Sequence, residues 1–299
     1  MNIVKLQIVV LIEKYKKVTD VAAEMGLKQP TVSFHMKSLE NELGASLFQY
    51  RSGRVLFTDA GRALYQYAVR IVSLAAEAER SVRQLSSFSS GTLELEAGYL
   101  PGTYLVPKML TQFIKLHPEA DVSLSVQSEH LVRERLRARD IQLAVLPVTD
   151  QPDESLHTAL IAEDEVVLIF APDHPLAGAV ELTAETAARE TWIQHDPTSF
   201  LRAISDKWAQ ENQVRLWSHT VVNTPEAFKR MVCEGGCVGL FSKKGIEAEV
   251  AAGRLQYAAL PGIPPKQASY VAAWRKDHTL TPMQQAFVDM TAAKDEDEL

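Results

Sequence analysis

The composition of this chain is that of an ordinary soluble protein. Its 299 residues are 46% hydrophobic and 23% charged, with a net charge of −7. This length is enough for two domains, one of them with a sizeable core. No apolar run approaches the roughly 20 residues that cross a bilayer, and the first residues lack the basic lead and the small-residue cleavage site of a signal peptide. We therefore expect a cytoplasmic protein.

The net charge is unevenly distributed along the chain. Residues 1–58 hold eight Lys or Arg against five Asp or Glu, and residues 59–90 hold four against three, which leaves −11 for residues 91–299. A basic N-terminal segment suits contact with nucleic-acid phosphates, and the acidic remainder disfavours non-specific binding elsewhere.

The N-terminal segment predicts three helices. The first covers Asn2–Tyr15 and has an apolar face that we expect to brace the other two. The second has apolar residues at helical spacing, with Thr19 as its expected N-cap and Gly26 at its end; they are Val18, Val21, Ala22 and Met25. The third covers Gln29–Leu43, with Pro30 in its first turn. Two helices joined by so tight a break predict a helix-turn-helix, in which the third helix is the recognition helix.

The recognition helix has one apolar stripe and one polar face. The stripe consists of Val32, Met36, Leu39 and Leu43, spaced 4, 3 and 4 residues apart. Short polar side chains on the other face can reach base edges and phosphates in a major groove. The residues that we expect to contact DNA from this helix and its start are Lys28, Gln29, Pro30, Thr31, Ser33, Phe34, His35 and Lys37. The alternative is an ordinary helical hairpin with a solvated face.

The run Gln29-Pro30-Thr31-Val32-Ser33 decides between these alternatives. It is followed by Leu39-Glu40, Leu43-Gly44, Leu47-Phe48, Phe57-Thr58 and Ala60-Gly61, and over about sixty residues this pattern closely resembles the N-terminal signature of the LysR-type transcriptional regulators. Three positions depart from the family's usual residues. Lys28 stands where Ser is usual, and Phe34 and His35 stand where Arg and Gln are frequent, which puts the preferred operator sequence in doubt.

The segment Leu47–Phe57 predicts a wing. Two short extended runs flank the turn Arg51-Ser52-Gly53-Arg54, which places Arg51 and Arg54 where they can follow the phosphate backbone or enter the minor groove. A surface hairpin with solvated arginines is the plainer alternative.

A long helix is expected from about Thr58, as its N-cap, to about Ser87. Its apolar stripe is Ala60, Leu64, Tyr67, Ile71, Leu74, Ala78, Val82 and Leu85. Such a sustained stripe favours a partner helix, either that of a second subunit or a surface of the C-terminal domain. The family resemblance implies a homodimer formed by two antiparallel linker helices. It also implies a homotetramer, which rests on the resemblance alone. Residues 86–91 are the expected hinge.

From Thr92 strands and helices alternate, which predicts an α/β region with largely parallel sheets. The expected strands are Thr92–Gly98, Asp121–Gln127, Ile141–Leu146, Glu165–Ala171, Thr191–Gln194, Val221–Asn223, Cys237–Ser242 and Ser269–Trp274. The resemblance implies two subdomains, as in type 2 periplasmic binding proteins, with the first over about 91–163 and 266–292 and the second over about 164–265. The expected division is therefore a DNA-binding domain at 1–58, a linker helix and hinge at 59–90, and an effector-binding domain at 91–299.

Ligands of such folds bind outside the carboxyl ends of strands, where helices begin. The residues at these positions that we expect to contact an effector are Tyr99, Thr103, Ser128, His130, Gln194, His195, Ser199 and Thr224. Hydroxyls and amides at helix starts favour a small carboxylate or other anion. The alternative is that each side chain caps its own helix.

Cofactors, metal sites and catalytic groups are not expected. Cys233 and Cys237 are four residues apart without a nearby His, and we expect two buried apolar thiols. The chain lacks the common catalytic and nucleotide-binding motifs in the right context. These features predict a LysR-type transcriptional regulator whose partners are double-stranded operator DNA, a small effector and, through the family, RNA polymerase. The alternative function is a cytoplasmic solute-binding protein without DNA recognition.

Overall fold

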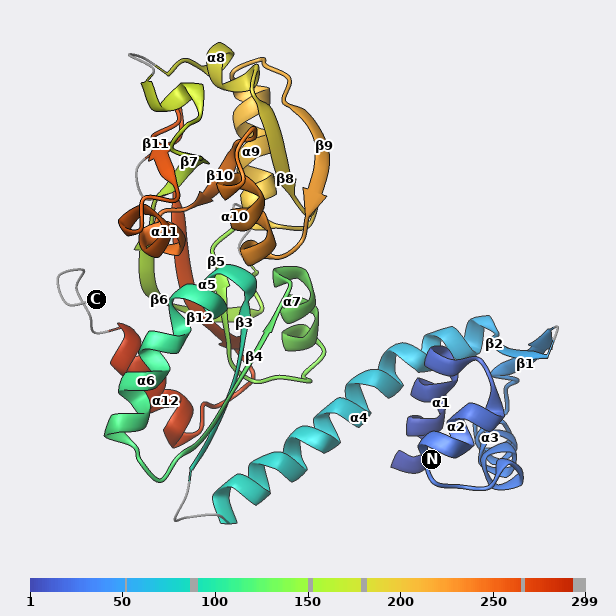
Figure 1. The fold of residues 1–299 in the computed structure, drawn as a ribbon. Coiled ribbons are helices and arrows are strands. Elements are labelled where there is room, and N and C mark those ends of the chain that lie inside the picture. The colour runs from blue at the N-terminus through green and yellow to red at the C-terminus, as the bar shows by residue number, and fades with distance from the viewer. Residues whose placement is uncertain (52, 87–90, 150–152, 179–181, 265–266, 293–299) are drawn as a thin grey trace. The chain divides into compact units, whose positions relative to one another are not determined.

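The computed structural model describes residues 1–51, 53–86, 91–149, 153–178, 182–264 and 267–292 (Figure 1). The chain divides into two compact units, one of Met1–Phe88 with Ala138–Asp140 and one of Ser89–Arg137 with Ile141–Leu299. In the described ranges no helix is both long and apolar enough to span a membrane.

The first three helices of the N-terminal unit are α1 (Ile3–Tyr15), α2 (Val18–Glu24) and α3 (Gln29–Leu43). The expectation for Gln29–Leu43 is confirmed at both ends. Gly26 and Gly44, which adopt the left-handed conformation with φ of 63° and 64°, follow α2 and α3 and let the chain turn away from each helix. The expected cap of α2 is wrong. Thr19 lies inside α2, whose N-cap Lys17 makes no capping hydrogen bond, and the Thr19 hydroxyl bonds to Asp20 instead.

A buried cation joins α1 to the recognition helix. Lys5 is 8% exposed, and its ammonium donates to the Ser38 hydroxyl at 2.8 Å and to the Glu42 carboxylate at 2.5 Å. Val32, Met36 and Leu39 of α3 are buried in the same small core as α1. Three members of the predicted stripe of α3 are therefore used for packing, whereas the fourth, Leu43, is 44% exposed. The polar face of α3 remains accessible.

The predicted wing is an antiparallel hairpin of β1 (Phe48–Arg51) and β2 (Arg54–Phe57). Its base is tied to α3, because the Glu40 carboxylate accepts hydrogen bonds from the backbone N–H groups of Leu47 (2.8 Å) and Phe48 (3.2 Å). Its tip turns at Gly53, whose φ is 74°.

The long helix is α4 (Asp59–Ser86), and the Thr58 hydroxyl accepts from the Gly61 N–H at 3.1 Å, as its predicted cap should. Six members of the predicted stripe are exposed, and four of them are large side chains exposed by 40–66%: Tyr67, Ile71, Leu74 and Val82. Most of the predicted hinge, residues 87–90, lies outside the described residues, as does the side chain of Leu85.

The C-terminal unit contains two groups of strands. A five-stranded sheet has the order β4-β3-β5-β12-β6, made of β4 (Asp121–Gln127), β3 (Thr92–Gly98), β5 (Ala144–Pro147), β12 (Ala268–Arg275) and β6 (Leu156–Asp164). The other group contains β10-β7-β11, made of β10 (Gly239–Ser242), β7 (Val166–Phe170) and β11 (Gln256–Ala258), and the pair β8 (Thr191–His195) and β9 (Trp217–Val222). A parallel bridge from Trp192 to Val238 links β8 to the segment before β10.

The expectation of largely parallel sheets is wrong. The β3–β4, β3–β5 and β8–β9 pairs are parallel, whereas every pairing of β12 and of β7 is antiparallel. The reason is the crossover: β6 leads into β7, and β12 returns the chain to the first sheet (Figure 1). Strands that leave or re-enter a sheet in this way run against those joined by helices.

Helices cover both groups of strands. In chain order they are α5 (Tyr99–Tyr104), α6 (Val106–Leu116), α7 (Glu129–Arg137), η1 (Pro175–Gly178), α8 (Ala184–Ala188), α9 (Phe200–Glu211), α10 (Pro225–Cys233), η2 (Lys244–Ile246), α11 (Glu247–Ala251) and α12 (Pro282–Ala292). Of these, α5, α7, α9 and α10 begin directly after β3, β4, β8 and β9 or a short loop later, and they position the site described next.

Candidate DNA-binding surface and effector cavity

The recognition helix presents most of the predicted DNA contacts to solvent. Six of them are exposed, namely Lys28, Gln29, Pro30, Thr31, Phe34 and Lys37, while Ser33 and His35 are half-buried. Phe34 is 68% exposed although it is apolar. A large apolar side chain at the surface of a helix start has no packing role here, and it can contact a thymine methyl group in a major groove.

His35 lies where the polar face meets the core. Its ring is 6.0 Å from the Phe34 ring in an edge-on arrangement. Its Nδ1 atom is buried and has no hydrogen-bond partner among the described residues.

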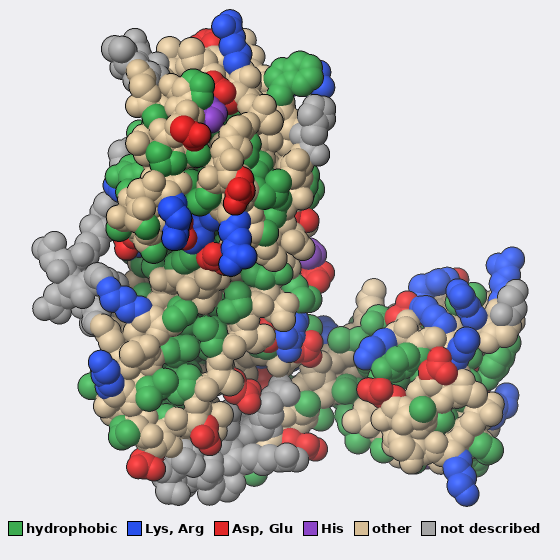
Figure 2. All heavy atoms as spheres, viewed as in Figure 1, with side chains coloured by type: hydrophobic (Ala, Val, Ile, Leu, Met, Phe, Trp, Pro, Cys, Tyr) green, Lys and Arg blue, Asp and Glu red, His purple; other side chains and the backbone are tan. Residues whose placement is uncertain are grey.

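The wing carries its cations at the tip. Arg51 and Arg54 pair across the hairpin and both side chains are exposed. Figure 2 shows Lys and Arg side chains gathered on the face of the N-terminal unit that is in view. This unit therefore combines an exposed recognition helix with a cationic wing, which is the arrangement of a winged DNA-binding domain.

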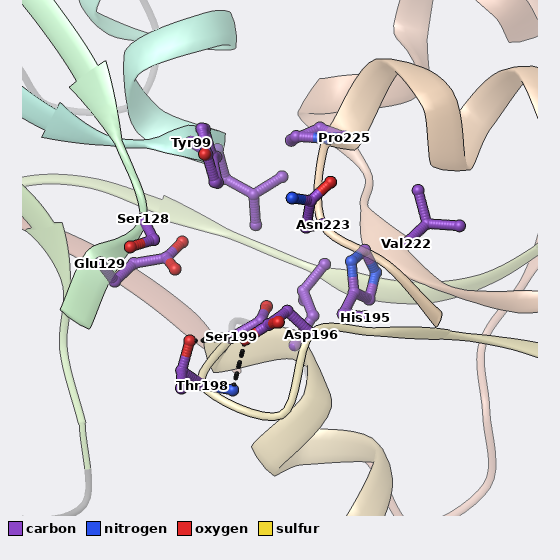
Figure 3. A pocket seen from close by; sticks show the side chains of 12 residues that line it. Tyr99, Ser128, Glu129, His195, Asp196, Thr198, Ser199, Val222, Asn223 and Pro225 are labelled. Carbon is purple, nitrogen blue, oxygen red and sulfur yellow. Dashed lines mark hydrogen bonds between the residues drawn. The ribbon is translucent and has the colours of Figure 1, made fainter. Parts of the chain in front are cut away.

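A cavity of about 310 Å³ lies in the C-terminal unit at the carboxyl ends of its parallel strands. Figure 3 shows side chains that converge on it from both groups of strands. Its lining residues are Tyr99, Leu100, Ser128, Glu129, His195, Asp196, Thr198, Ser199, Leu201, Val222, Asn223 and Pro225. Four of the eight predicted effector contacts are among them: Tyr99, Ser128, His195 and Ser199.

Besides the short helix α5, whose first residue Tyr99 lines this cavity, three helices begin at it. Ser128 precedes α7, Ser199 is the N-cap of α9, and Thr224, between the lining residues Asn223 and Pro225, is the N-cap of α10. The Ser128 hydroxyl accepts from the Leu131 N–H at 3.4 Å. In the structure neither Ser199 nor Thr224 makes a side-chain capping bond. The Ser199 hydroxyl and the first-turn N–H groups of α9 are therefore placed for a ligand.

His195 forms the floor of the cavity as a neutral imidazole. It is 7% exposed, stacks on Phe228 with ring centroids 3.9 Å apart, and donates from Nε2 to the Leu240 carbonyl oxygen at 2.9 Å. Burial lowers the pKa of His195 to about 4, and the nearby Arg202 also lowers it. With the proton on Nε2, the Nδ1 atom is a hydrogen-bond acceptor.

The cavity also contains two carboxyl groups. The Asp196 carboxylate accepts from the Thr198 N–H at 2.9 Å and the Thr198 hydroxyl at 2.6 Å, and these bonds lower its pKa. Glu129 is 7% exposed, and burial raises the pKa of its carboxyl. Among the described residues that line this cavity there is no Lys or Arg.

A second cavity of about 480 Å³ adjoins the first and shares Glu129, Thr198 and Ser199 with it. Its lining differs in charge. Its basic residues are Arg133, Arg137, Lys207 and His130, and its acidic residues are Glu129 and Asp153. Arg137 pairs with Asp153 at 2.7 Å, and Arg133 donates to the Pro147 carbonyl oxygen at 2.5 Å. The two cavities together form a cleft with an acceptor-rich part and a cationic part.

Three further predicted effector residues do not line the first cavity. Thr103 is exposed on α5 and lines neither cavity. His130 lines the second cavity and lies 3.3 Å from the Glu134 carboxylate. Gln194 is buried, with its side-chain oxygen bonded to the Ser205 hydroxyl at 2.9 Å.

Sequence reasoning did not single out Glu129, Asp196, Thr198 or Asn223. All four lie in the loops that the strand-end rule selects, so the signal was present in their position. Hydroxyl and amide groups at helix starts suit an anion better than carboxyls do, and strand ends do not reveal which side chains face the cavity.

The two cysteines are free thiols. Cys237 is buried, in line with expectation, whereas Cys233 is half-buried. Burial raises the pKa of both thiols, which lowers their reactivity. Within the described ranges no cluster of three or more His, Cys, Asp or Glu side chains is arranged to hold a metal ion.

Two protein families match the chain. Residues 3–62 match the bacterial regulatory helix-turn-helix proteins of the lysR family, and residues 86–295 match the LysR substrate binding domain. The first covers the winged unit, and the second covers the unit that contains the cleft.

Relatives of known description agree with these families. The RuBisCO operon transcriptional regulator of Allochromatium vinosum is 26% identical and covers 95% of this chain and 93% of its own. A probable RuBisCO transcriptional regulator of Synechocystis is 30% identical over 79% of this chain and 70% of its own. The regulatory domain of Synechocystis CcmR, solved in complex with 2-phosphoglycolate, has a TM-score of 0.62 and 25% identity, covering 68% of this chain and 96% of its own. The chain therefore belongs to the LysR family of transcriptional regulators, with an N-terminal helix-turn-helix DNA-binding domain and a C-terminal effector-binding domain.

Proposed function

We propose that this regulator is controlled by a small anionic effector bound in the cleft formed by the two adjoining cavities. The observation that carries the proposal is the convergence of the starts of α7, α9 and α10 on one cavity, with the Ser199 hydroxyl not used as a cap. Helix starts offer free N–H groups and a partial positive charge to an anion. Tyr99, Ser128, His195 and Ser199 are the proposed contacts in the first cavity, and His130 is one in the second.

A short phosphorylated carboxylate is the proposed effector class. The CcmR regulatory domain is described with 2-phosphoglycolate, and several relatives are described as regulators of RuBisCO genes. The cationic lining of the second cavity favours a ligand with more than one negative charge. Effector binding would change the geometry of the subunits, and through it DNA bending or contact with RNA polymerase.

The recognition helix and the wing are the proposed DNA contacts. The proposal covers Lys28, Gln29, Pro30, Thr31, Ser33, Phe34, His35 and Lys37 from the helix, and Arg51 and Arg54 from the wing. Exposure of most of this set supports it. In this scheme the phosphates are held by the cations and base edges are read by the short polar side chains.

We also propose that the protein is a homodimer, formed through the exposed stripe on α4, and that it acts in the cytoplasm by binding and not by catalysis. Tyr67, Ile71, Leu74 and Val82 are exposed to an extent that a partner helix would explain. A homotetramer, expected from the family, is part of the same proposal. The functional boundaries remain those expected from sequence, with the division near residues 58 and 90.

Calorimetry with 2-phosphoglycolate tests the effector site. We expect Ser199→Ala to weaken binding by about tenfold, because a hydrogen bond to a charged group is lost. Thr103→Ala is the matched control, since Thr103 is also a hydroxyl in a predicted loop but lines neither cavity, and its affinity should equal that of the wild type. Equal loss in both variants, or no loss in Ser199→Ala, would contradict the proposed site.

Fluorescence anisotropy with DNA from upstream of the protein's own gene tests the DNA contacts. Binding should survive unrelated competitor DNA and collapse in the double variant Ser33→Ala, His35→Ala. Thr19→Ala, an exposed hydroxyl on α2, is the control. Binding that ignores the double substitution and disappears with modest salt would mean phosphate attraction without sequence readout. Adding 2-phosphoglycolate to the same assay then measures whether the two domains are coupled.

A further inference from the structure

Glu129 is held in the cleft by the local fold. It is the first residue of α7, which begins after β4 with only Ser128 between them, and it is 7% exposed. Gly98, at the end of the neighbouring strand β3, leaves room for its side chain, because a Cβ atom on Gly98 would lie 2.9 Å from Glu129 Cγ. Figure 3 shows its carboxyl group pointing into the cavity. The side chain lines both cavities, so it lies where the two parts of the cleft meet.

No side chain in the described part of the chain donates a hydrogen bond to the carboxyl of Glu129. Its own backbone N–H donates to it, and the charge of Arg133 attracts it. A buried polar group without a partner costs free energy, and this cost is removed when a ligand supplies the missing donor. Burial raises the pKa of the carboxyl, as expected for a group that lacks such a donor.

Two further groups in the first cavity are acceptors. Asp196 is a carboxylate, and the imidazole of His195 offers its unprotonated Nδ1 atom. No Lys or Arg is among the described residues that line this cavity. Beside these acceptors, a ligand group that donates hydrogen bonds is therefore favoured.

Cations lie on the other side of Glu129. Arg133, one turn along α7, lines the second cavity with Arg137 and Lys207. The cleft therefore separates a region suited to donors from a region suited to anions, with Glu129 at the boundary.

We infer that Glu129 is a specificity-determining residue: the effector is a hydroxylated anion whose hydroxyl group donates to the Glu129 carboxyl while its anionic group lies toward Arg133. This inference rests on the proposed effector cleft and names the ligand chemistry that the cleft selects. A short acid with a hydroxyl near its middle satisfies both regions, whereas the same acid without the hydroxyl leaves Glu129 unsatisfied.

Calorimetry with a matched pair of ligands tests the inference. 3-Phosphoglycerate and 3-phosphonooxypropionate have the same carbon chain and the same ionisable groups, and they differ by one hydroxyl. Wild-type protein should bind 3-phosphoglycerate about ten- to a hundredfold more tightly. Glu129→Ala should bind both equally, and Glu129→Gln, which keeps an acceptor oxygen, should retain part of the preference. Glu119→Ala, an exposed carboxyl outside both cavities, should behave as the wild type.

The outcomes separate this inference from the proposed function. Equal wild-type affinity for the pair, or a preference that survives Glu129→Ala, overturns the role of Glu129 and leaves the anion site standing. Binding of 2-phosphoglycolate but of neither member of the pair overturns it as well. If none of the three ligands binds, the proposed effector class fails together with the inference. Thermal unfolding of each variant checks that lost binding does not reflect a lost fold.

Discussion

The stability of the effector-binding unit should depend on pH through His195. The imidazole is buried against Phe228 and bonded to the Leu240 carbonyl, and burial lowers its pKa from 6.5 to about 4. Below pH 6.5 the unfolded chain therefore takes up a proton that the folded chain refuses until about pH 4. The unfolded state binds more protons in this window, so stability falls as the pH falls.

The size of the effect follows from these two pKa values. Between pH 7 and pH 5 the uptake of a proton by the unfolded chain should lower the free energy of unfolding by about 2 kcal/mol. His195→Phe removes this contribution and keeps a flat ring on Phe228. It also leaves the Leu240 carbonyl without its donor, so we expect a loss of about 1–3 kcal/mol at pH 7. The informative quantity is therefore the difference in unfolding free energy between pH 7 and pH 5, and not the unfolding free energy at one pH.

Urea unfolding followed by tryptophan fluorescence measures this quantity. All four tryptophans lie between residues 192 and 274, so the signal reports on the effector-binding unit. The difference in unfolding free energy between pH 7 and pH 5 should be about 2 kcal/mol smaller in His195→Phe than in the wild type. His157→Phe, which replaces an exposed imidazole, is the control and should keep the wild-type difference. Equal pH sensitivity in His195→Phe and the wild type would refute the reasoning.

Three further predictions follow from the packing and the charges. Phe228→Ala should lower the free energy of unfolding by about 3–5 kcal/mol, because the ring is fully buried and stacks on His195, and a urea-measured loss under about 1 kcal/mol would contradict it. Arg54→Ala should lower the steepness with which log affinity for DNA falls against log salt concentration by about 1, as expected for the loss of one phosphate contact. Arg62→Ala is the control and should leave this slope unchanged, because Arg62 is paired with Asp59 on α4. Equal slopes in Arg54→Ala and the wild type would exclude the contact. Leu74→Glu should dissociate the dimer, because it places an unpaired charge in the apolar stripe that the dimer buries. Light scattering measures the mass of the particle, which Gln66→Glu, the control, should leave unchanged. A dimer that survives Leu74→Glu would place the interface elsewhere.

Local sequence determined the helices and strands that are marked by an apolar repeat and by capping or turn residues at their ends. The recognition helix was predicted as Gln29–Leu43, and β3 and β4 were predicted as Thr92–Gly98 and Asp121–Gln127, all with the bounds that the structure gives. In each case an apolar repeat is flanked on both sides by a turn or capping residue. These signals act between neighbouring residues, so they can be read without the fold.

Tertiary structure decided the features that depend on distant partners. The strand β6 (Leu156–Asp164) was missed, because its residues do not alternate regularly and its place is fixed by pairing with β12 more than a hundred residues later. The same long-range pairing made the sheets mixed. Strand pairing between remote segments leaves little trace in either segment by itself.

In the cleft, too, local sequence located the loops, and tertiary structure decided which side chains face the cavity. The strand-end rule found its loops, but neighbouring residues of β8 have opposite roles: Gln194 is bonded within the protein to Ser205, whereas His195 lines the cavity. Successive side chains of a strand point to opposite faces, and only the packed structure reveals which face is open. Glu129 became a candidate for the same reason, since a largely buried carboxyl that faces a cavity can be recognised only when everything around it is in place.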